Sequence, residues 1–314
     1  MSMHRLAGIT LGVPDLEAVG RYYEEFGLRR SRETEHELVF STTDGGEQLR
    51  LVPAPFRRLV AVTIGVDDPD DLGRAAARLG RAAVATQSSK STSDGLAAVE
   101  PVTGVRFELA VQSRVGQTPE PASPVNSPGR IERTAARTPG ILREKRVRPR
   151  RLGHVVLGST DVEATSAFIT EGIGFKVSDL VGGGHGAFLR CSTDHHNMLV
   201  QKAPVNFVHH SAWQVDDIDE VGRGAMGMLE DHPERHVWGL GRHHAGSNFF
   251  WYLRDPAGTF SEYYSDLDDI PEDAIWTPEV MEGARGLFNW GPPPPPSFVN
   301  PEDLAALMTG AHTR

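Results

Sequence analysis

The chain has 314 residues, a formal net charge of −10 and one cysteine, Cys191. The negative charge argues against broad affinity for nucleic acid or for anionic membranes, and a lone cysteine excludes an intrachain disulfide. No apolar run approaches the length of a transmembrane helix, and the first residues lack the pattern of a secretory signal, so we expect a cytoplasmic protein with no membrane contact.

The first 111 residues predict one domain in which the order strand, helix and strands occurs twice. "LGVPDLEAVGRYYEEFGLR" reads as the end of a strand, a cap and an amphipathic helix that stops at glycine. The short runs ELVFST and EQLRLV follow as strands. "VAVTIGVDDPDDLGRAAARLG" then gives a second strand and helix, and "EPVTGVRFELAV" gives a turn and a strand.

Residues 112–149 are predicted to be a linker. The segment is rich in Pro, Ser, Thr and Arg, as in "QTPEPASPVNSPGRIERTAARTPG". Such composition favours an extended chain along the surface, with the arginines solvated or paired with acidic groups.

Residues 150–268 repeat the pattern of the first domain, and residues 269–314 form a tail. "LGSTDVEATSAFITEGIGFK" repeats the opening strand and helix, with Thr160 and Glu163 at capping-box spacing and a helix end near Gly172 or Gly174. "HHSAWQVDDIDEVGRGAMGML" and "DPAGTFSEYYSD" repeat the later anchors. The sequence therefore predicts an α+β fold of repeated modules, with curved mixed sheets and helices on one face.

Histidine distinguishes the second copy from the first. Ten of the thirteen histidines lie between His154 and His244. With the repeats in register, the second copy has two imidazoles where the first has small residues, and both copies keep a glutamate. The matched pairs are His154 with Gly8, His210 with Ala61, and Glu262 with Glu108.

Two neutral imidazoles and one carboxylate form the ligand set of non-haem Fe(II) centres that bind a chelating substrate together with dioxygen. The second copy therefore predicts a metal site at His154, His210 and Glu262. The same residues would also fit two hydrogen-bonded core histidines and an ion-paired glutamate, an alternative that spacing alone leaves open.

The second half resembles the type I extradiol ring-cleavage dioxygenases of the vicinal oxygen chelate (glyoxalase/bleomycin resistance) superfamily. The resemblance rests on GHVVLGSTD, on HHSAWQVDDIDE and above all on "GLGRHHAGSNFFWYLRDPAGTFSEYYSD". It implies paired βαβββ modules, with the first domain free of metal and Fe(II) or Mn(II) held by His154, His210 and Glu262.

The resemblance also implies catalytic residues. His243 of the GRHH element matches a histidine beside the metal, and Tyr252 matches an active-site tyrosine. His196 is the expected acid–base group; if CSTDHHNMLV is a strand, neighbouring His195 points to the opposite face. His209 and His244 are expected on outward faces, exposed or just behind the ligands, and His185 is expected in a loop.

The substrate pocket departs from relatives that accept acidic catechols. Those relatives place arginines where this chain has Trp238 and, close to Trp290, Gly286 and Leu287; only Arg285 is near. An aromatic ring and a leucine favour a neutral or apolar ring substituent. The tail "GLFNWGPPPPPSF" is expected to act as a lid or a subunit contact.

The resemblance implies a reaction in which a catechol and O2 give a ring-opened product, in a protein that forms a homo-oligomer. Two other functions fit the same fold: a glyoxalase-type isomerase or lyase, and a non-enzymatic binding module like the antibiotic-sequestering members of the superfamily. Glyoxalases commonly share metal ligands between the two copies, whereas the binding modules lack a complete triad. Iron content of the purified protein would discriminate most simply.

Overall fold

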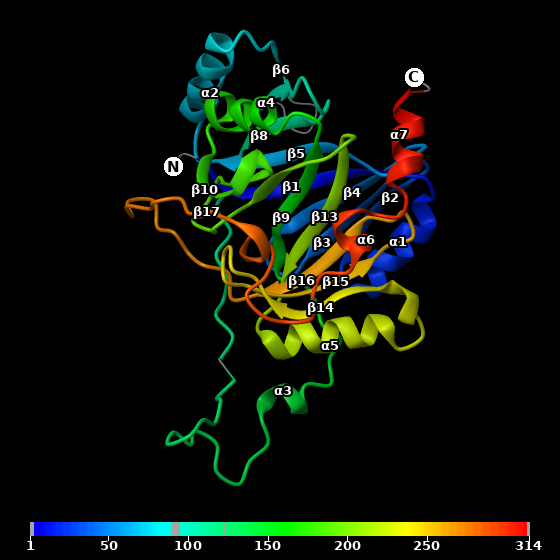
Figure 1. Ribbon diagram of the computed structural model, residues 1–314, viewed down its shortest axis with the longest axis vertical. Helices are drawn as coiled ribbons and strands as arrows, with labels where there is room; N and C mark the ends of the chain where they lie inside the picture. Colours follow the sequence, from blue (N-terminus) through cyan, green and yellow to red (C-terminus); the bar gives the residue numbers. More distant parts are fainter. Residues whose placement is uncertain (1–2, 89–94, 122, 313–314) are drawn as a thin grey trace.

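The protein is described by a computed structural model that covers residues 3–88, 95–121 and 123–312. Within these residues the strands form two mixed sheets, one from each half of the chain (Figure 1). The first half contains β1 (Met3–Val13), α1 (Leu16–Glu25), β2 (Arg29–Thr34), β3 (Glu37–Thr42), β4 (Gly46–Pro53), β5 (Arg58–Val66), α2 (Pro69–Arg81), β6 (Thr86–Ser88), β7 (Leu96–Val99) and β8 (Arg106–Val111).

The second half repeats this order and adds a linker helix and a tail. Its elements are α3 (Pro139–Leu142), β9 (Arg151–Ser159), α4 (Val162–Ala167) with a π-helical turn (Phe168–Ile173), β10 (Lys176–Val181), β11 (Gly186–Arg190), β12 (Met198–Lys202), β13 (Phe207–Gln214), α5 (Ile218–Leu229), β14 (His236–Arg242), β15 (Phe249–Arg254), β16 (Phe260–Ser265), β17 (Val280–Met281), α6 (Pro296–Val299) and α7 (Leu304–His312). The predicted α+β fold of repeated βαβββ modules is confirmed.

Each sheet joins two modules through an antiparallel pair at its centre. The first sheet has the order β2-β3-β4-β1-β5-β8-β7-β6, and the second has β14-β15-β16-β13-β9-β12-β11-β10-β17. The strand pairing confirms the register of the repeat. Gly8 pairs with Thr63, which pairs with Glu108, and in the second sheet His154 pairs with Ala212, which pairs with Glu262.

Helices from each half pack against elements of the other. The ring of Phe26, the C-cap residue of α1, stacks on Tyr263 of β16 with 3.9 Å between ring centroids. The hydroxyl of Tyr22 in α1 forms a hydrogen bond with Ser261 of β16. In the opposite direction, Arg78 of α2 donates to the carbonyls of Gly172 and Ile173. One hydrophobic core therefore continues through both halves and fixes the second sheet against the first.

The start of α4 differs from its prediction. The N-cap is Asp161, whose carboxylate accepts from the backbone N–H of Ala164 at 2.9 Å, so the predicted capping box of Thr160 and Glu163 is wrong. A carboxylate accepts a hydrogen bond from a free backbone N–H at the start of a helix as readily as a threonine hydroxyl does. Of the two predicted stops, Gly172 and Gly174, the helix ends at Gly174, which has φ 110°, a left-handed conformation that favours glycine.

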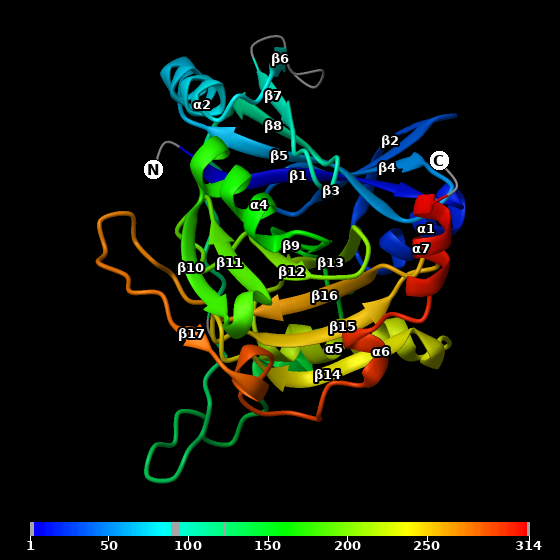
Figure 2. The same cartoon turned by 45° about the horizontal axis from the view of Figure 1, so that its top comes forward.

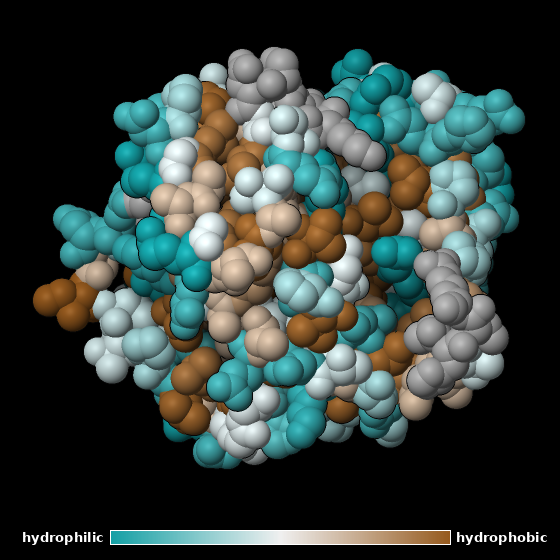
Figure 3. All heavy atoms as spheres, turned by 90° about the horizontal axis from the view of Figure 1, so that it is seen from above, coloured by the Kyte–Doolittle hydropathy of each residue, from teal (hydrophilic) through white to brown (hydrophobic). Residues whose placement is uncertain are grey.

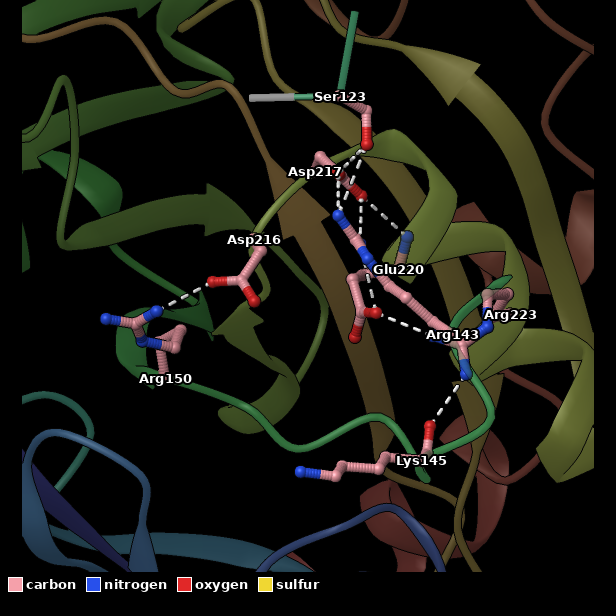
Figure 4. Close-up of polar contacts among 8 residues, drawn as sticks. All are labelled: Ser123, Arg143, Lys145, Arg150, Asp216, Asp217, Glu220 and Arg223. Carbon is pink, nitrogen blue, oxygen red and sulfur yellow. Dashed lines mark hydrogen bonds and ion pairs between the residues drawn. The ribbon is translucent and has the colours of Figure 1, made fainter. Parts of the chain in front are cut away.

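The segment between the sheets leaves the body as an extended loop and returns through α3 (Figures 1 and 2). Its return path is held by ion pairs to α5 and to the residues before it, as Figure 4 shows. Arg143 contacts Asp217 at 2.7 Å and Glu220 at 3.1 Å, and Arg150 contacts Asp216 at 2.8 Å. Arg143 of the predicted linker is therefore paired with acidic groups, one of the two expected outcomes, and Arg150 at the start of the second domain is paired in the same way.

Hydrophilic residues lie between the apolar ones over most of the face seen in Figure 3. Small separate apolar patches of this kind are ordinary for a protein surface. Among the described residues, none of the helices combines the length and apolar character needed to cross a membrane.

Candidate metal centre

The three predicted ligands lie on three adjacent strands at the centre of the second sheet. His154 is on β9, His210 on β13 and Glu262 on β16. The Nε2 atoms of His154 and His210 lie 3.1 and 3.5 Å from Oε2 of Glu262. Among the described residues, these three form the group whose ligand atoms all lie within 4.8 Å of one another and could hold a metal ion.

The donor set fits a divalent transition metal. All three side chains are buried, and Nε2 of His210 has no hydrogen-bond partner. Burial holds the pKa of His210 well below its usual range, which keeps the ring in the neutral form that binds metal. Neighbouring ligands of an octahedral ion lie about 3 Å apart, close to the two distances from Glu262.

His209 supports His210 from behind. It was expected on an outward face, either exposed or just behind the ligands. It is buried, and its Nδ1 lies 2.7 Å from Nδ1 of His210, so it lies behind that ligand and not on an exposed face. The pairing of β13 with β9 shifts register between Val208 and His210. That bulge removes the strict alternation on which the expectation depended.

The hydrogen bonds around His209 assign the proton on His210. Nε2 of His209 lies 2.7 Å from the carbonyl oxygen of Phe298, which can only accept, so Nε2 of His209 donates. Burial lowers the pKa of His209 to about 4, so the ring is neutral and its Nδ1 accepts from Nδ1–H of His210. The lone pair of His210 is thereby directed to the centre, as expected for a ligating histidine.

Asn248 holds the carboxylate ligand. Its Nδ2 donates to Oε1 of Glu262 at 3.1 Å. The other carboxylate oxygen, Oε2, is the one that lies near the two histidines. Asn248 is fully buried and lies just before β15. The sequence reasoning missed this residue, although it falls within the quoted GLGRHHAGSNFF element.

His196 lines the same cavity as the ligands His154 and His210, and its ring centroid is 4.2 Å from that of His154. His195 and His196 were expected on opposite faces of a strand. That expectation is wrong, because residues 191–197 form an irregular segment before β12, and the Nδ1 atoms of the two rings are 3.1 Å apart. His195 lies behind His196, in a hydrogen bond with Asp179.

His243 and Tyr252 form a second hydrogen-bonded pair at the cavity. Nδ1 of His243 donates to the carbonyl oxygen of Leu287, so its Nε2 accepts from the Tyr252 hydroxyl at 2.8 Å. Burial, with the nearby Glu262 carboxylate, raises the pKa of Tyr252 well above its usual value, which keeps the phenol protonated. Tyr252 and Glu262 face each other across β15 and β16.

The remaining histidines lie away from the centre. His244 is part-buried and 3.2 Å from Glu279, and His185 is exposed in the turn before β11. Neither lines the cavity.

One of the four proposed substrate residues lines the cavity. Leu287 does so, together with Gly286 and Phe298. Trp238 is buried one layer away, stacked on Tyr252, and Trp290 packs beside Phe249. The Arg285 side chain is 70% exposed and lies 3.8 Å from Glu279. The other lining residues are Val156, Phe188, Leu199, Gln201, Ala245 and the histidines and tyrosine described above.

Comparison with known proteins identifies the family. The model of the Glyoxalase/Bleomycin resistance protein/Dioxygenase superfamily matches residues 151–263. Metapyrocatechase 2 of Cupriavidus necator is 30% identical over 306 residues, which cover 95% of this chain and 92% of that protein. The chain belongs to the type I extradiol dioxygenases of this superfamily. It is an extradiol dioxygenase with a site of two histidines and one carboxylate.

Two further relatives of this extradiol dioxygenase bear on substrate and metal. The 3-methylcatechol 2,3-dioxygenase of Pseudomonas putida is 33% identical over 120 residues, 36% of this chain and 40% of that protein. The Mn(II)-bound glyoxalase from Novosphingobium aromaticivorans superposes with a TM-score of 0.72 and is 26% identical, covering 93% of each chain.

The first half of this dioxygenase lacks an equivalent centre among the described residues. Glu108, the counterpart of Glu262, forms an ion pair with Arg106 at 2.6 Å. The positions equivalent to the two histidines are Gly8 and Ala61, which carry no donor. Among the described residues, the candidate metal group therefore lies in the second sheet.

Proposed function

We propose that this extradiol dioxygenase opens catechols that carry a neutral or apolar ring substituent, with Fe(II) or Mn(II) held by His154, His210 and Glu262. The observation that carries the proposal is one cavity lined by two of the ligands, His154 and His210, and also by the His196 imidazole and the His243–Tyr252 pair. The third ligand, Glu262, lies within 3.5 Å of both ligating histidines. Catechol and O2 are the two substrates. Self-association, expected from the family, stays a prediction.

The metal, when bound, supplies a site at which a chelating diol and dioxygen meet and between which electrons pass. Two neutral histidines and one carboxylate leave the centre with a charge of about +1 for a divalent ion, so a catechol bound as a monoanion makes it neutral. A neutral assembly suits a cavity from which water is largely excluded.

His196 is the proposed acid–base residue. Its ring lines the cavity with its centroid 4.2 Å from that of His154, and burial together with the neighbouring His154 holds its pKa well below the usual range. A neutral ring can take a proton from a substrate hydroxyl and return it to the opened product. The Tyr252 hydroxyl, whose proton is donated to His243, is placed to accept a hydrogen bond from a substrate hydroxyl.

The cavity wall favours a neutral substituent. Apart from the histidines, its described lining is apolar except for Gln201 and the tyrosine, and contains no arginine or lysine. A carboxylate on the substrate would lose its hydration there without a cationic partner, which costs several kcal/mol.

A glyoxalase-type reaction is the second candidate, because the Mn(II)-bound glyoxalase superposes over almost the whole chain. Against it, all three donors here come from one half of the chain. A binding module without activity is a third reading, but it gives no reason for a full ligand set with an oriented His196 beside it.

The test is a parallel assay of one preparation loaded anaerobically with Fe(II) or Mn(II). Catechol and 3-methylcatechol are added with O2, and ring opening is followed by the visible absorbance of the semialdehyde and by O2 uptake. We expect one O2 consumed per catechol. If the loaded protein opens neither catechol but isomerises the methylglyoxal–glutathione hemithioacetal, the glyoxalase reading replaces the proposal.

A further inference from the structure

Asp179, His195 and His196 form a hydrogen-bonded line that leads from β10 to the cavity. Oδ2 of Asp179 lies 2.9 Å from Nε2 of His195, and Nδ1 of His195 lies 3.1 Å from Nδ1 of His196. All three side chains are buried. The indole of Trp276 covers His195 with 5.6 Å between ring centroids, so water has little access to the line.

The hydrogen bonds along this line have one consistent direction. Oδ1 of Asp179 accepts the backbone N–H of Glu279 at 2.8 Å, and a carboxylate has no proton to give. Nε2 of His195 therefore donates to Oδ2. When His195 is neutral, its other nitrogen carries the lone pair, so Nδ1 of His195 accepts from Nδ1–H of His196.

This direction decides which nitrogen of His196 is available for chemistry. With the proton on Nδ1, the lone pair of His196 is on Nε2. The ring lines the cavity, with Phe188 edge-on at 5.1 Å and His154 at 4.2 Å between ring centroids. A base must present a lone pair to the proton it takes, so the opposite tautomer would be inert in that step.

We propose that Asp179 and His195 are positioning residues that hold His196 as its Nδ1–H tautomer, so that Nε2 can accept a proton from the bound diol. The inference rests on the proposed function, in which His196 is the acid–base residue. The O–H bond of the diol breaks as the N–H bond at Nε2 forms, and the same proton returns to an oxygen of the ring-opened product.

The same arrangement recurs on the other side of the centre. There the acceptor is the carbonyl oxygen of Phe298, the intermediate ring is His209 and the oriented ring is His210. In both lines a group that can only accept a hydrogen bond fixes the tautomer of the first histidine of the pair. That histidine then fixes the tautomer of the second through a hydrogen bond between the two Nδ1 atoms. The doubled histidines HH at 195–196 and 209–210 thus have one physical explanation.

The substitution Asp179→Asn tests the direction without changing volume. The amide oxygen keeps the bond from the Glu279 N–H, so Nδ2 faces His195 and donates to it. Both rings of the line must then reverse, which puts the proton of His196 on Nε2. We expect kcat for 3-methylcatechol to fall about 10²- to 10⁴-fold, as for a wrong tautomer in other base–histidine–carboxylate sites, while KM changes little.

The decisive readout is independent of turnover. Nitrogen-15 NMR of the full chain loaded with diamagnetic Zn(II) reports which ring nitrogen of His196 carries the proton. We expect Nδ1–H in the parent and Nε2–H in Asp179→Asn, with equal metal content. His195→Phe, which fills the space without a hydrogen bond, should also lower kcat. Asp255→Asn changes a buried aspartate in the turn between β15 and β16; it is the matched control and should change neither readout.

Two results would overturn the inference: Nε2–H at His196 in the parent, or an Asp179→Asn protein with unchanged tautomer and unchanged kcat. Failure of the proposed function is distinguishable, because the parent protein itself would then open no catechol whatever the state of His196.

Discussion

Gly8 and His154 occupy equivalent positions in β1 and β9. Gly8 pairs with Thr63 as His154 pairs with Ala212. A Cβ at Gly8 would lie 3.2 Å from the carbonyl oxygen of Gln48 and 3.4 Å from its Cα. The backbone of β4 therefore occupies the space beside Gly8 in which a side chain would lie. A histidine at this position would require β4 to move.

The ligand set predicts that removal of one imidazole releases the metal. We expect His210→Ala to lose most bound Fe(II) or Mn(II) and all turnover, because two donors remain and Nε2 of His210 has no other partner in the structure. Metal content after desalting, measured by mass spectrometry, is the readout.

The matched control is His185→Ala, which removes an exposed histidine outside the cavity. It should retain the parent's metal content and activity. Full metal and full turnover in His210→Ala would disprove the ligand assignment.

The modules, their order and the register of the ligands could be predicted because the repeat carries a strong pattern. The period-two strands and glycine-terminated helices recur in the same order, so a single alignment placed three residues from distant segments in one site. The capping residue of α4 could not be predicted in the same way, since Thr160 and Asp161 are adjacent and either can cap a helix.

The immediate surroundings of the ligands were harder to predict. The faces of the paired histidines depended on strict strand alternation, which fails at the bulge beside His210 and in the irregular segment before β12. Asp179 and Phe298 reach the centre from β10 and from the tail, and no local pattern marks such long-range contacts.

The hydrogen bond behind His210 predicts an effect on metal affinity. We expect His209→Phe to keep the core filled but to weaken Fe(II) binding about 10- to 100-fold, because nothing then holds the proton on Nδ1 of His210. A competitive titration against a chelator of known affinity gives the measurement. An unchanged affinity would show that His209 only fills space.

His196 is predicted to act in chemistry and not in metal binding. We expect His196→Phe to keep its metal and to lower kcat about 10²- to 10⁴-fold, the usual contribution of an acid–base group. Metal content and steady-state rates on 3-methylcatechol are measured on the same sample. Loss of the metal together with activity would instead make His196 part of the metal-binding set.

Asp255 predicts a pH dependence of stability with an unusual sign. Burial raises its pKa to about 7, and Oδ2 has no hydrogen-bond partner. Because the folded pKa lies above the unfolded value of about 3.9, the ionised group destabilises the fold. That penalty grows as the pH rises from about 4 to about 7 and stays constant above that.

Asp255→Asn removes this dependence, since the amide oxygen still accepts from the N–H groups of Ala257 and Thr259. Its free energy of unfolding relative to the parent should be higher at pH 8 than at pH 5 by about 1–4 kcal/mol. Asp217→Asn is the contrast. Burial acts to raise the pKa of Asp217, but the hydrogen bond from Arg143 lowers it overall, so its relative stability should not change over that range. Parallel curves for parent and Asp255→Asn would contradict the prediction.

The cavity wall predicts a preference for neutral catechols. Leu287 lines the cavity, and the nearest arginine of the tail, Arg285, is 70% exposed and directed to Glu279. We expect kcat/KM for 3-methylcatechol to exceed that for 3,4-dihydroxyphenylacetate about a hundredfold, which corresponds to about 2.7 kcal/mol. Leu287→Arg should narrow the ratio by giving the acid a partner inside the cavity, and Arg285→Leu should leave it unchanged. The prediction would be wrong if the parent had equal kcat/KM values for the two substrates and Arg285→Leu lowered the value for 3,4-dihydroxyphenylacetate alone. That result would show that Arg285 turns inward and anchors the carboxylate.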